Sequence, residues 1–149
     1  GKAQVFESEE EAFAAYNAHA IKPGTGVVVR YEGPRGGPGM KELHRVTEIM
    51  KGIPNSAVIT DGRFSGASGG LSVGYLCPEA FEGGAIALVR DGDEIHVDLN
   101  KNLIELNVSD EELSARRASW EPVIHENGGH LLERYSKQVA SAKTGAVLS

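Results

Sequence analysis

The residues best suited to chemistry lie in one glycine-rich segment, ITDGRFSGASGG at 59–70, which follows an apolar run. Glycine has no Cβ, so main-chain N–H groups and a compact ligand can come close to the two serines there, Ser65 and Ser68. On local features the segment could receive a phosphate, an acyl group or a metal-bound substrate. A wide turn in which one serine caps a helix is the purely structural alternative.

A serine hydrolase is one possibility. Residues 66–70 match the G-x-S-x-G pattern of a nucleophile elbow, with Ser68 as nucleophile and Asp98 and His125 as downstream partners. The elbow requires a strand that ends directly before it, whereas the predicted strand ends several residues early, near Thr60. The sequence therefore disfavours a hydrolase. A phosphate cradle is disfavoured as well, because no glycine segment carries G-K-[ST] or a well-placed G-x-G-x-x-G.

A second candidate is Glu42, which follows another glycine-rich segment, EGPRGGPGM at 32–40. A helix is predicted over 40–52, and an acid in its first turn gains about 0.3–1 kcal/mol from the helix dipole. This structural role is the alternative to metal binding. Both glycine segments follow predicted strands, so we expect Glu42 and Ser65 to line one shared cleft.

Other residues give weaker signals. His96 lies opposite the apolar face of its predicted strand and is expected at the surface. Cys77, next to Pro78, is expected to be an inert core thiol. The helical segment DEELSARR at 110–117 is expected to present a solvated face. The single cysteine excludes a cysteine-based metal cluster made by this chain alone.

Length and composition fit one ordinary soluble domain. The chain has 149 residues, of which 40% are hydrophobic and 24% are charged. No run approaches the roughly 20 apolar residues of a membrane span, and the acidic residues 1–20 are not expected to be a secretory signal. The net charge of −6 argues against a general nucleic-acid binder. The cysteine usage suggests a reducing, cytoplasmic setting.

Apolar periodicity and turn residues predict the elements that position these candidates. Two S-x-x-E capping boxes mark helix starts, at Ser8 and at Ser109. Helices are predicted over 9–19, 40–52, 109–120 and 128–142. Strands are predicted over 27–31 and 56–60, followed by a three-stranded meander over 84–90, 93–99 and 102–108. The pattern is that of a β-rich α+β domain.

Four longer motifs, in this order along the chain, carry a resemblance to a known family: VVVRYEGPRGGPGMKEL, ITDGRFSGASGG, CPEAFEGGAIALVRDGDEIHVDL and VSDEELSARRASW. Together they resemble the C-terminal part of the dihydroxy-acid dehydratase / 6-phosphogluconate dehydratase family. The resemblance implies an α+β fold of the swivelling β/β/α type, with a barrel-like sheet and flanking helices. It also implies that residues 1–149 form a single C-terminal domain of a larger, homo-oligomeric enzyme.

The family resemblance implies a reaction and roles for individual residues. Water is removed from a 2,3-dihydroxy acid, either a branched-chain or a sugar acid, to leave a 2-keto acid. The DGR-[FM]-SG motif makes Ser65 the general base for the C2 proton, and the PGM-x-E motif makes Glu42 a Mg²⁺ ligand. Arg63, Gly66 and Ser68 are the residues expected to contact the substrate.

The same resemblance implies cofactors that this chain cannot hold alone. The family's N-terminal domain supplies the cysteines of an iron–sulfur cluster, whose iron acts as a Lewis acid on the C3 hydroxyl, and most Mg²⁺ ligands. We therefore expect the isolated chain to fold without dehydratase activity. One departure is Tyr75, where the family commonly has histidine. A non-catalytic binding or regulatory module of the same fold is the alternative function.

Overall fold

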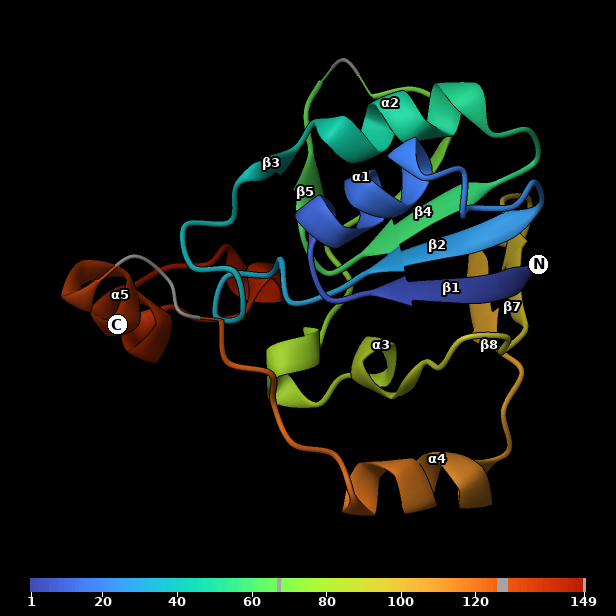
Figure 1. The fold of residues 1–149 in the computed structure, drawn as a ribbon. Coiled ribbons are helices and arrows are strands. Elements are labelled where there is room, and N and C mark those ends of the chain that lie inside the picture. The colour runs from blue at the N-terminus through green and yellow to red at the C-terminus, as the bar shows by residue number, and fades with distance from the viewer. Residues whose placement is uncertain (67, 126–128, 149) are drawn as a thin grey trace.

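The structure is a computed structural model that describes residues 1–66, 68–125 and 129–148. Its centre is a four-stranded sheet of parallel strands in the order β1-β2-β4-β6 (Figure 1). These strands are β1 Lys2–Phe6, β2 Thr25–Val29, β4 Ala57–Thr60 and β6 Leu71–Val73. Two further ladders are a parallel pair, β3 Glu42–Leu43 with β5 Arg63–Phe64, and an antiparallel hairpin, β7 Ile95–Asp98 with β8 Leu103–Leu106.

Helices cover both faces of the central sheet. Two of them, α1 and α2, lie on one face; α3 lies on the other, with α4 beyond it, and α5 stands apart from the sheet (Figure 1). Their bounds are α1 Glu9–Asn17, α2 Arg45–Gly52, α3 Ala85–Leu88, α4 Asp110–Ala118 and α5 His130–Gln138, with 3-10 turns η1 Ala80–Glu82 and η2 Ala142–Thr144. No helix in the described ranges has the length and apolarity to span a bilayer.

The core lies on both sides of β2, which is buried along its whole length. Val27 and Val29 pack toward α1 and α2, whereas Val28 packs toward α3 and the β7–β8 hairpin. Strands buried on both faces are typical of parallel sheets, and β-branched valine suits them. The result is a rigid central strand whose carboxyl end leads directly into the glycine-rich segment 32–40.

Several predicted elements are confirmed. The Ser8 hydroxyl accepts a hydrogen bond from the Glu11 N–H at 3.2 Å, and the Ser109 hydroxyl accepts one from the Glu112 N–H at 3.3 Å, so both predicted caps start helices. Strand β4 and the β7–β8 hairpin lie within their predicted segments, whereas β2 begins and ends two residues before the predicted 27–31. Helix α5 lies within the predicted 128–142, although residue 128 is outside the described residues.

The predicted strand over 84–90 is wrong. Residues Ala85–Leu88 form the short helix α3 instead, so the predicted three-stranded meander is a two-stranded hairpin. The chain turns sharply into this helix because Gly84 packs against the main chain: a Cβ on Gly84 would lie 1.7 Å from the Pro78 carbonyl oxygen. A short buried apolar run fits a helical turn as well as a strand, and tertiary packing decides between them.

The predicted helix over 40–52 begins later than expected. Met40 has a φ of +44°, which no right-handed helix accommodates, and Glu42–Leu43 form strand β3. Helix α2 starts at Arg45, where the Glu9 carboxylate of α1 accepts the first main-chain N–H groups. Glu42 is therefore a strand residue, and the expected helix-dipole role does not apply to it.

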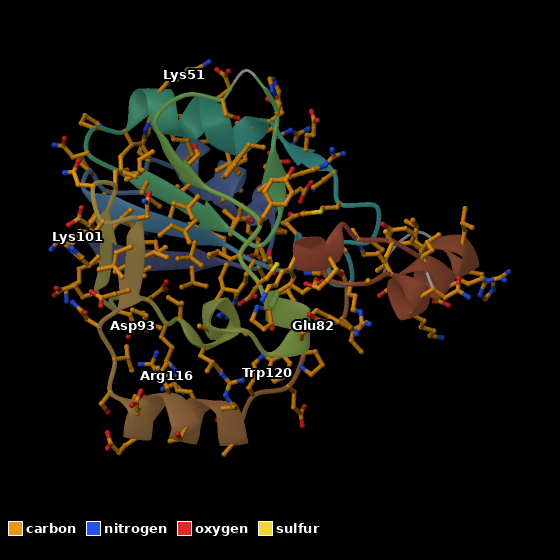
Figure 2. All side chains as sticks on the ribbon, turned by 180° about the vertical axis from the view of Figure 1, so that it is seen from behind. Lys51, Glu82, Asp93, Lys101, Arg116 and Trp120 are labelled. Atoms are coloured by element: carbon orange, nitrogen blue, oxygen red, sulfur yellow. The ribbon has the colours of Figure 1, made fainter. Side chains whose placement is uncertain are left out.

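Helix α4 is held by an arginine rather than by an apolar face, so the predicted solvated face of 110–117 is only partly right. The Arg116 guanidinium binds Asp93 at 2.5 and 3.1 Å and donates to the Leu88 carbonyl at 2.8 Å (Figure 2). The Arg116 side chain is only 9% exposed. Bidentate pairing of this kind suits the planar guanidinium.

The observed class is α+β with a parallel sheet. Apart from one bridge between Lys2 and Glu94, the ladders are separate in the described ranges, so the barrel-like closure and the swivelling of the domain remain predictions. His96 is exposed, as predicted. Cys77 is half-buried instead of lying in the core, and its thiol contacts the Tyr75 carbonyl oxygen at 3.3 Å.

Candidate active site

The β3–β5 ladder brings the two predicted site segments together. Its register pairs Glu42 with Arg63 and Leu43 with Phe64. Leu43 and Phe64 pack into the core, and side chains alternate along a strand, so Glu42 and Arg63 face the other side. The Glu42 Oε1 lies 3.6 Å from the Arg63 Nη1. Ser65 directly follows β5 and lies two residues after Arg63, the partner of Glu42 in the ladder.

Two neighbouring serines in this segment differ in their hydrogen bonding. The Ser68 hydroxyl donates to the Ser65 carbonyl at 2.6 Å, and the Ser68 N–H donates to the same oxygen at 3.1 Å. The Ser65 hydroxyl is buried and, among the described residues, has no hydrogen-bond partner. Buried polar atoms are nearly always paired, so an orphan hydroxyl at a predicted site is a place where a ligand can bind.

Arg63 ties the two glycine-rich segments to each other. Its Nε donates to the Met40 carbonyl at 2.6 Å, while its Nη1 lies near Glu42. The side chain is still 39% exposed. The guanidinium carries further N–H donors in a planar fork, which suits a carboxylate group of a substrate.

Space beside Ser65 is available at Gly66. A Cβ built on Gly66 would meet no atom within 4 Å, whereas one built on Gly62 would lie 2.7 Å from the Glu32 Cβ. The glycines of one segment therefore differ in role: Gly62 is required by packing, and Gly66 leaves room next to the orphan hydroxyl. Tyr75 borders this loop, since its N–H donates to the Gly62 carbonyl at 2.9 Å and its side chain is exposed.

Asp61 is a positioning residue that the sequence analysis missed. It is fully buried, and its carboxylate accepts hydrogen bonds from the main-chain N–H groups of Tyr31 at 3.2 Å, Glu32 at 3.0 Å and Ala80 at 2.8 Å. Burial raises the pKa of Asp61, and these hydrogen bonds act against that rise. Asp61 thus joins the ends of β2 and β4 just before Arg63. An acid directly after a buried strand was the available signal.

Glu79 holds much of the other glycine-rich segment, 32–40, in its conformation. Its buried carboxylate accepts hydrogen bonds from the N–H groups of Arg35 at 3.0 Å and Gly36 at 2.8 Å. A Cβ on Gly33 would lie 2.6 Å from the Glu79 Oε2. The chain therefore wraps around a side chain of the same protein, and burial raises the pKa of that carboxyl. These glycines serve internal packing rather than a phosphate.

The described residues contain no group of three or more histidine, cysteine, aspartate or glutamate side chains that could hold a metal ion. Glu42, about half exposed, offers one carboxylate of the kind that Mg²⁺ prefers. Glu42 can thus supply one ligand of a magnesium site. They do not fit an iron–sulfur cluster, which requires several thiolates where this chain has only Cys77.

The hydrolase arrangement is not assembled. The Ser68 hydroxyl is bound to a carbonyl oxygen, and Asp98 accepts the N–H groups of Asn100 at 3.0 Å and Lys101 at 3.1 Å in the hairpin turn. His125 instead lies edge-on to Tyr31, with ring centroids 6.0 Å apart. None of the three residues is hydrogen-bonded to another in the described part of the chain.

Comparison with known proteins decides the family. The model of the dihydroxy-acid/6-phosphogluconate dehydratase C-terminal family matches residues 1–146. This chain belongs to that family. It is also similar to proteins named dihydroxy-acid dehydratase: it is 54% identical to the one from Pyrococcus furiosus, 48% to that from Sulfurimonas denitrificans and 51% to that from Moorella thermoacetica. Each match covers 99% of this chain and 27% of the relative, so the domain spans about a quarter of their length.

Proposed function

We propose that this domain completes the active site of a hydro-lyase that converts a 2,3-dihydroxy acid into a 2-keto acid. The observation that carries the proposal is the buried hydroxyl of Ser65, which has no hydrogen-bond partner among the described residues and directly follows the strand that pairs with that of the half-exposed Glu42. The names of the relatives support the same chemistry. Because the domain matches only 27% of their length, the remaining groups would come from the other part of the parent protein.

Ser65 acts as the general base in this proposal. Its Oγ takes the proton from C2 of the substrate, the hydroxide that leaves C3 is protonated to water, and the enol tautomerises to the 2-keto acid. A buried serine alkoxide is costly without nearby positive charge. A Mg²⁺ ion held by Glu42 and by ligands from elsewhere would supply that charge.

The other residues bind and orient the substrate. Arg63 offers its exposed donors to the substrate carboxylate, and the open space at Gly66 admits the carbon chain beside Ser65. Ser68 holds the turn that presents Ser65 and would contact the substrate from there. Branched-chain and sugar acids share the carboxylate and the C2–C3 diol, so the proposal covers both.

The proposed setting is a cytoplasmic homo-oligomer. Its N-terminal domain would carry the iron–sulfur cluster, and this domain would swivel against it to close the site. The chain's lone cysteine leaves cluster ligation to that other domain.

The test compares two serines three residues apart in the full-length protein that contains this domain. Ser65→Ala is expected to lower kcat by about 10³-fold, the usual contribution of a positioned general base. Ser68→Ala, whose hydroxyl is already bound to a carbonyl, is expected to lower it less than about tenfold. Cluster absorbance and Mg²⁺ binding should stay unchanged in both. A Ser65→Ala enzyme with near-normal kcat would remove Ser65 from the reaction.

A further inference from the structure

Lys41, which directly precedes β3, is held by three glutamates. Its Nζ lies 2.6 Å from the Glu10 Oε1, 3.7 Å from the Glu32 Oε1 and 3.9 Å from the Glu9 Oε2. Consecutive residues of an extended chain point to opposite sides. When Lys41 is fixed toward α1, Glu42 must therefore face Arg63.

Two of these glutamates are buried and bind the main chain as well. Glu9 and Glu32 are each only 5% exposed. The Glu9 Oε1 accepts the N–H groups of Arg45 at 2.7 Å and Val46 at 3.3 Å, and the Glu32 Oε1 accepts the Glu9 N–H at 2.8 Å. The chain is thus fastened to the start of α1 both before and after Glu42.

The fastening is needed because β3 has little structure of its own. It is two residues long and pairs only with β5 in the described ranges. The chain enters it through Met40, whose φ of +44° is unfavourable for a side-chain-bearing residue. A Mg²⁺ ligand must be placed in near-ideal octahedral geometry, and partners that orient a ligand typically change metal affinity about 10–100-fold.

We propose that Lys41, held by Glu9, Glu10 and Glu32, is a positioning residue that sets the place of Glu42 for binding a divalent cation. This rests on the proposed function, in which Glu42 is a metal ligand. None of the three glutamates is proposed as a ligand of the ion, because Glu9 and Glu32 are buried and accept main-chain N–H groups and Glu10 is paired with Lys41.

The test measures Mn²⁺ binding to the full-length protein by electron paramagnetic resonance, which does not depend on turnover. Lys41→Met is expected to raise the Mn²⁺ Kd about tenfold, and Lys41→Arg should restore it to within about threefold. The matched control is Lys51→Met, since Lys51 is also a surface lysine paired with a glutamate, Glu48, at 3.3 Å. It should change the Kd less than about twofold.

A second variant, Glu10→Gln, tests the proposal even if Lys41→Met fails to fold. Glu10 is exposed and makes the shortest contact to Lys41, so Glu10→Gln should leave the unfolding temperature unchanged and raise the Kd about threefold. Glu42→Gln separates the two proposals. Normal Mn²⁺ binding by Glu42→Gln would contradict the proposed function. Weak binding by Glu42→Gln, with normal binding by Lys41→Met and Glu10→Gln, would overturn only the role of Lys41.

Discussion

The candidate site at the β3–β5 ladder and the region that supports it use the same residue types in opposite ways. On the side of Glu42, Arg63 and Ser65, a carboxylate is half exposed, a guanidinium keeps open donors and a buried hydroxyl has no partner among the described residues. In the supporting region, at the ends of β2 and β4 and in segment 32–40, Asp61 and Glu79 are buried and accept several main-chain N–H groups each. Residue type therefore does not distinguish the candidate site from the region that supports it. The number of hydrogen bonds that each polar side chain makes does distinguish them.

The glycines follow the same division. Gly33 and Gly62, in the supporting region, are required because a Cβ would collide with Glu79 or Glu32. Gly66, beside Ser65, faces open space. A glycine-rich motif thus combines positions fixed by internal packing with a position that leaves room for a ligand. Only substitutions can separate these contributions experimentally.

Removing the central acceptor of the supporting region, Asp61, should have the largest effect. Asp61→Ala leaves three buried main-chain N–H groups without their acceptor, and is expected to lower the free energy of unfolding by about 4 kcal/mol. The matched control is Asp98→Ala, which frees two N–H groups at an exposed hairpin turn and should cost about 1 kcal/mol. Urea unfolding measures both. Equal losses would mean that Asp61 is no more than a turn residue.

The buried Glu32 should make stability depend on pH. Burial raises its pKa to about 7 from an ordinary 4.5, so the folded state favours the protonated form. Its stabilising contribution is complete below pH 4.5 and is lost as the pH rises through 7. Glu32→Gln keeps an acceptor for the Glu9 N–H but cannot ionise. Relative to Glu32→Gln, the native protein should lose about 3 kcal/mol between pH 4.5 and 8. Parallel stability curves would contradict this.

The two kinds of glycine should respond differently to one added methyl group. Gly33→Ala is expected to lower the free energy of unfolding by about 2 kcal/mol, because its Cβ would overlap Glu79. Gly66→Ala should cost less than about 0.5 kcal/mol, since its Cβ meets nothing within 4 Å. Chemical denaturation compares them directly. A large loss for Gly66→Ala would show that the space beside Ser65 is not open.

Arg63 should affect substrate affinity more than the rate of the chemical step. Arg63→Met in the full-length protein is expected to raise KM about tenfold and to change kcat less, because one charge-assisted contact to the substrate is lost. The control is Arg45→Met, because the exposed Arg45 guanidinium lies 5.4 Å from the Phe13 ring centre. Steady-state kinetics distinguish them. A fall in kcat with unchanged KM would place Arg63 in the chemical step instead.

The sequence predicted the elements that carry their own local signal. Capping boxes predicted α1 and α4. Valine-rich and isoleucine-containing runs predicted β2 and β4, and polar turns predicted the β7–β8 hairpin. Strands β3 and β5 were missed, because two residues carry no periodicity. Strand β1 was missed too, and only its pairing with β2 defines it.

The sequence proposes residues for the site, whose roles remain predictions, but it could not predict their geometry. Motif resemblance selected Ser65 and Glu42, and the structure brings their segments onto adjoining strands. The strand placement of Glu42 depends on the φ of Met40 and on the cap that Glu9 supplies to α2 from another helix. Both are tertiary effects. Asp61 was overlooked for the same reason, since its partners come from distant parts of the chain.

The most direct test of the central claim is a crystal structure of the full-length protein with Mg²⁺ and an unreactive substrate analogue. Our account predicts a Glu42 carboxylate oxygen about 2.1 Å from the ion and the Ser65 Oγ about 3–3.5 Å from C2 of the analogue. A Mg²⁺ ion bound more than about 6 Å from Glu42, with Ser65 facing away from the analogue, would contradict it.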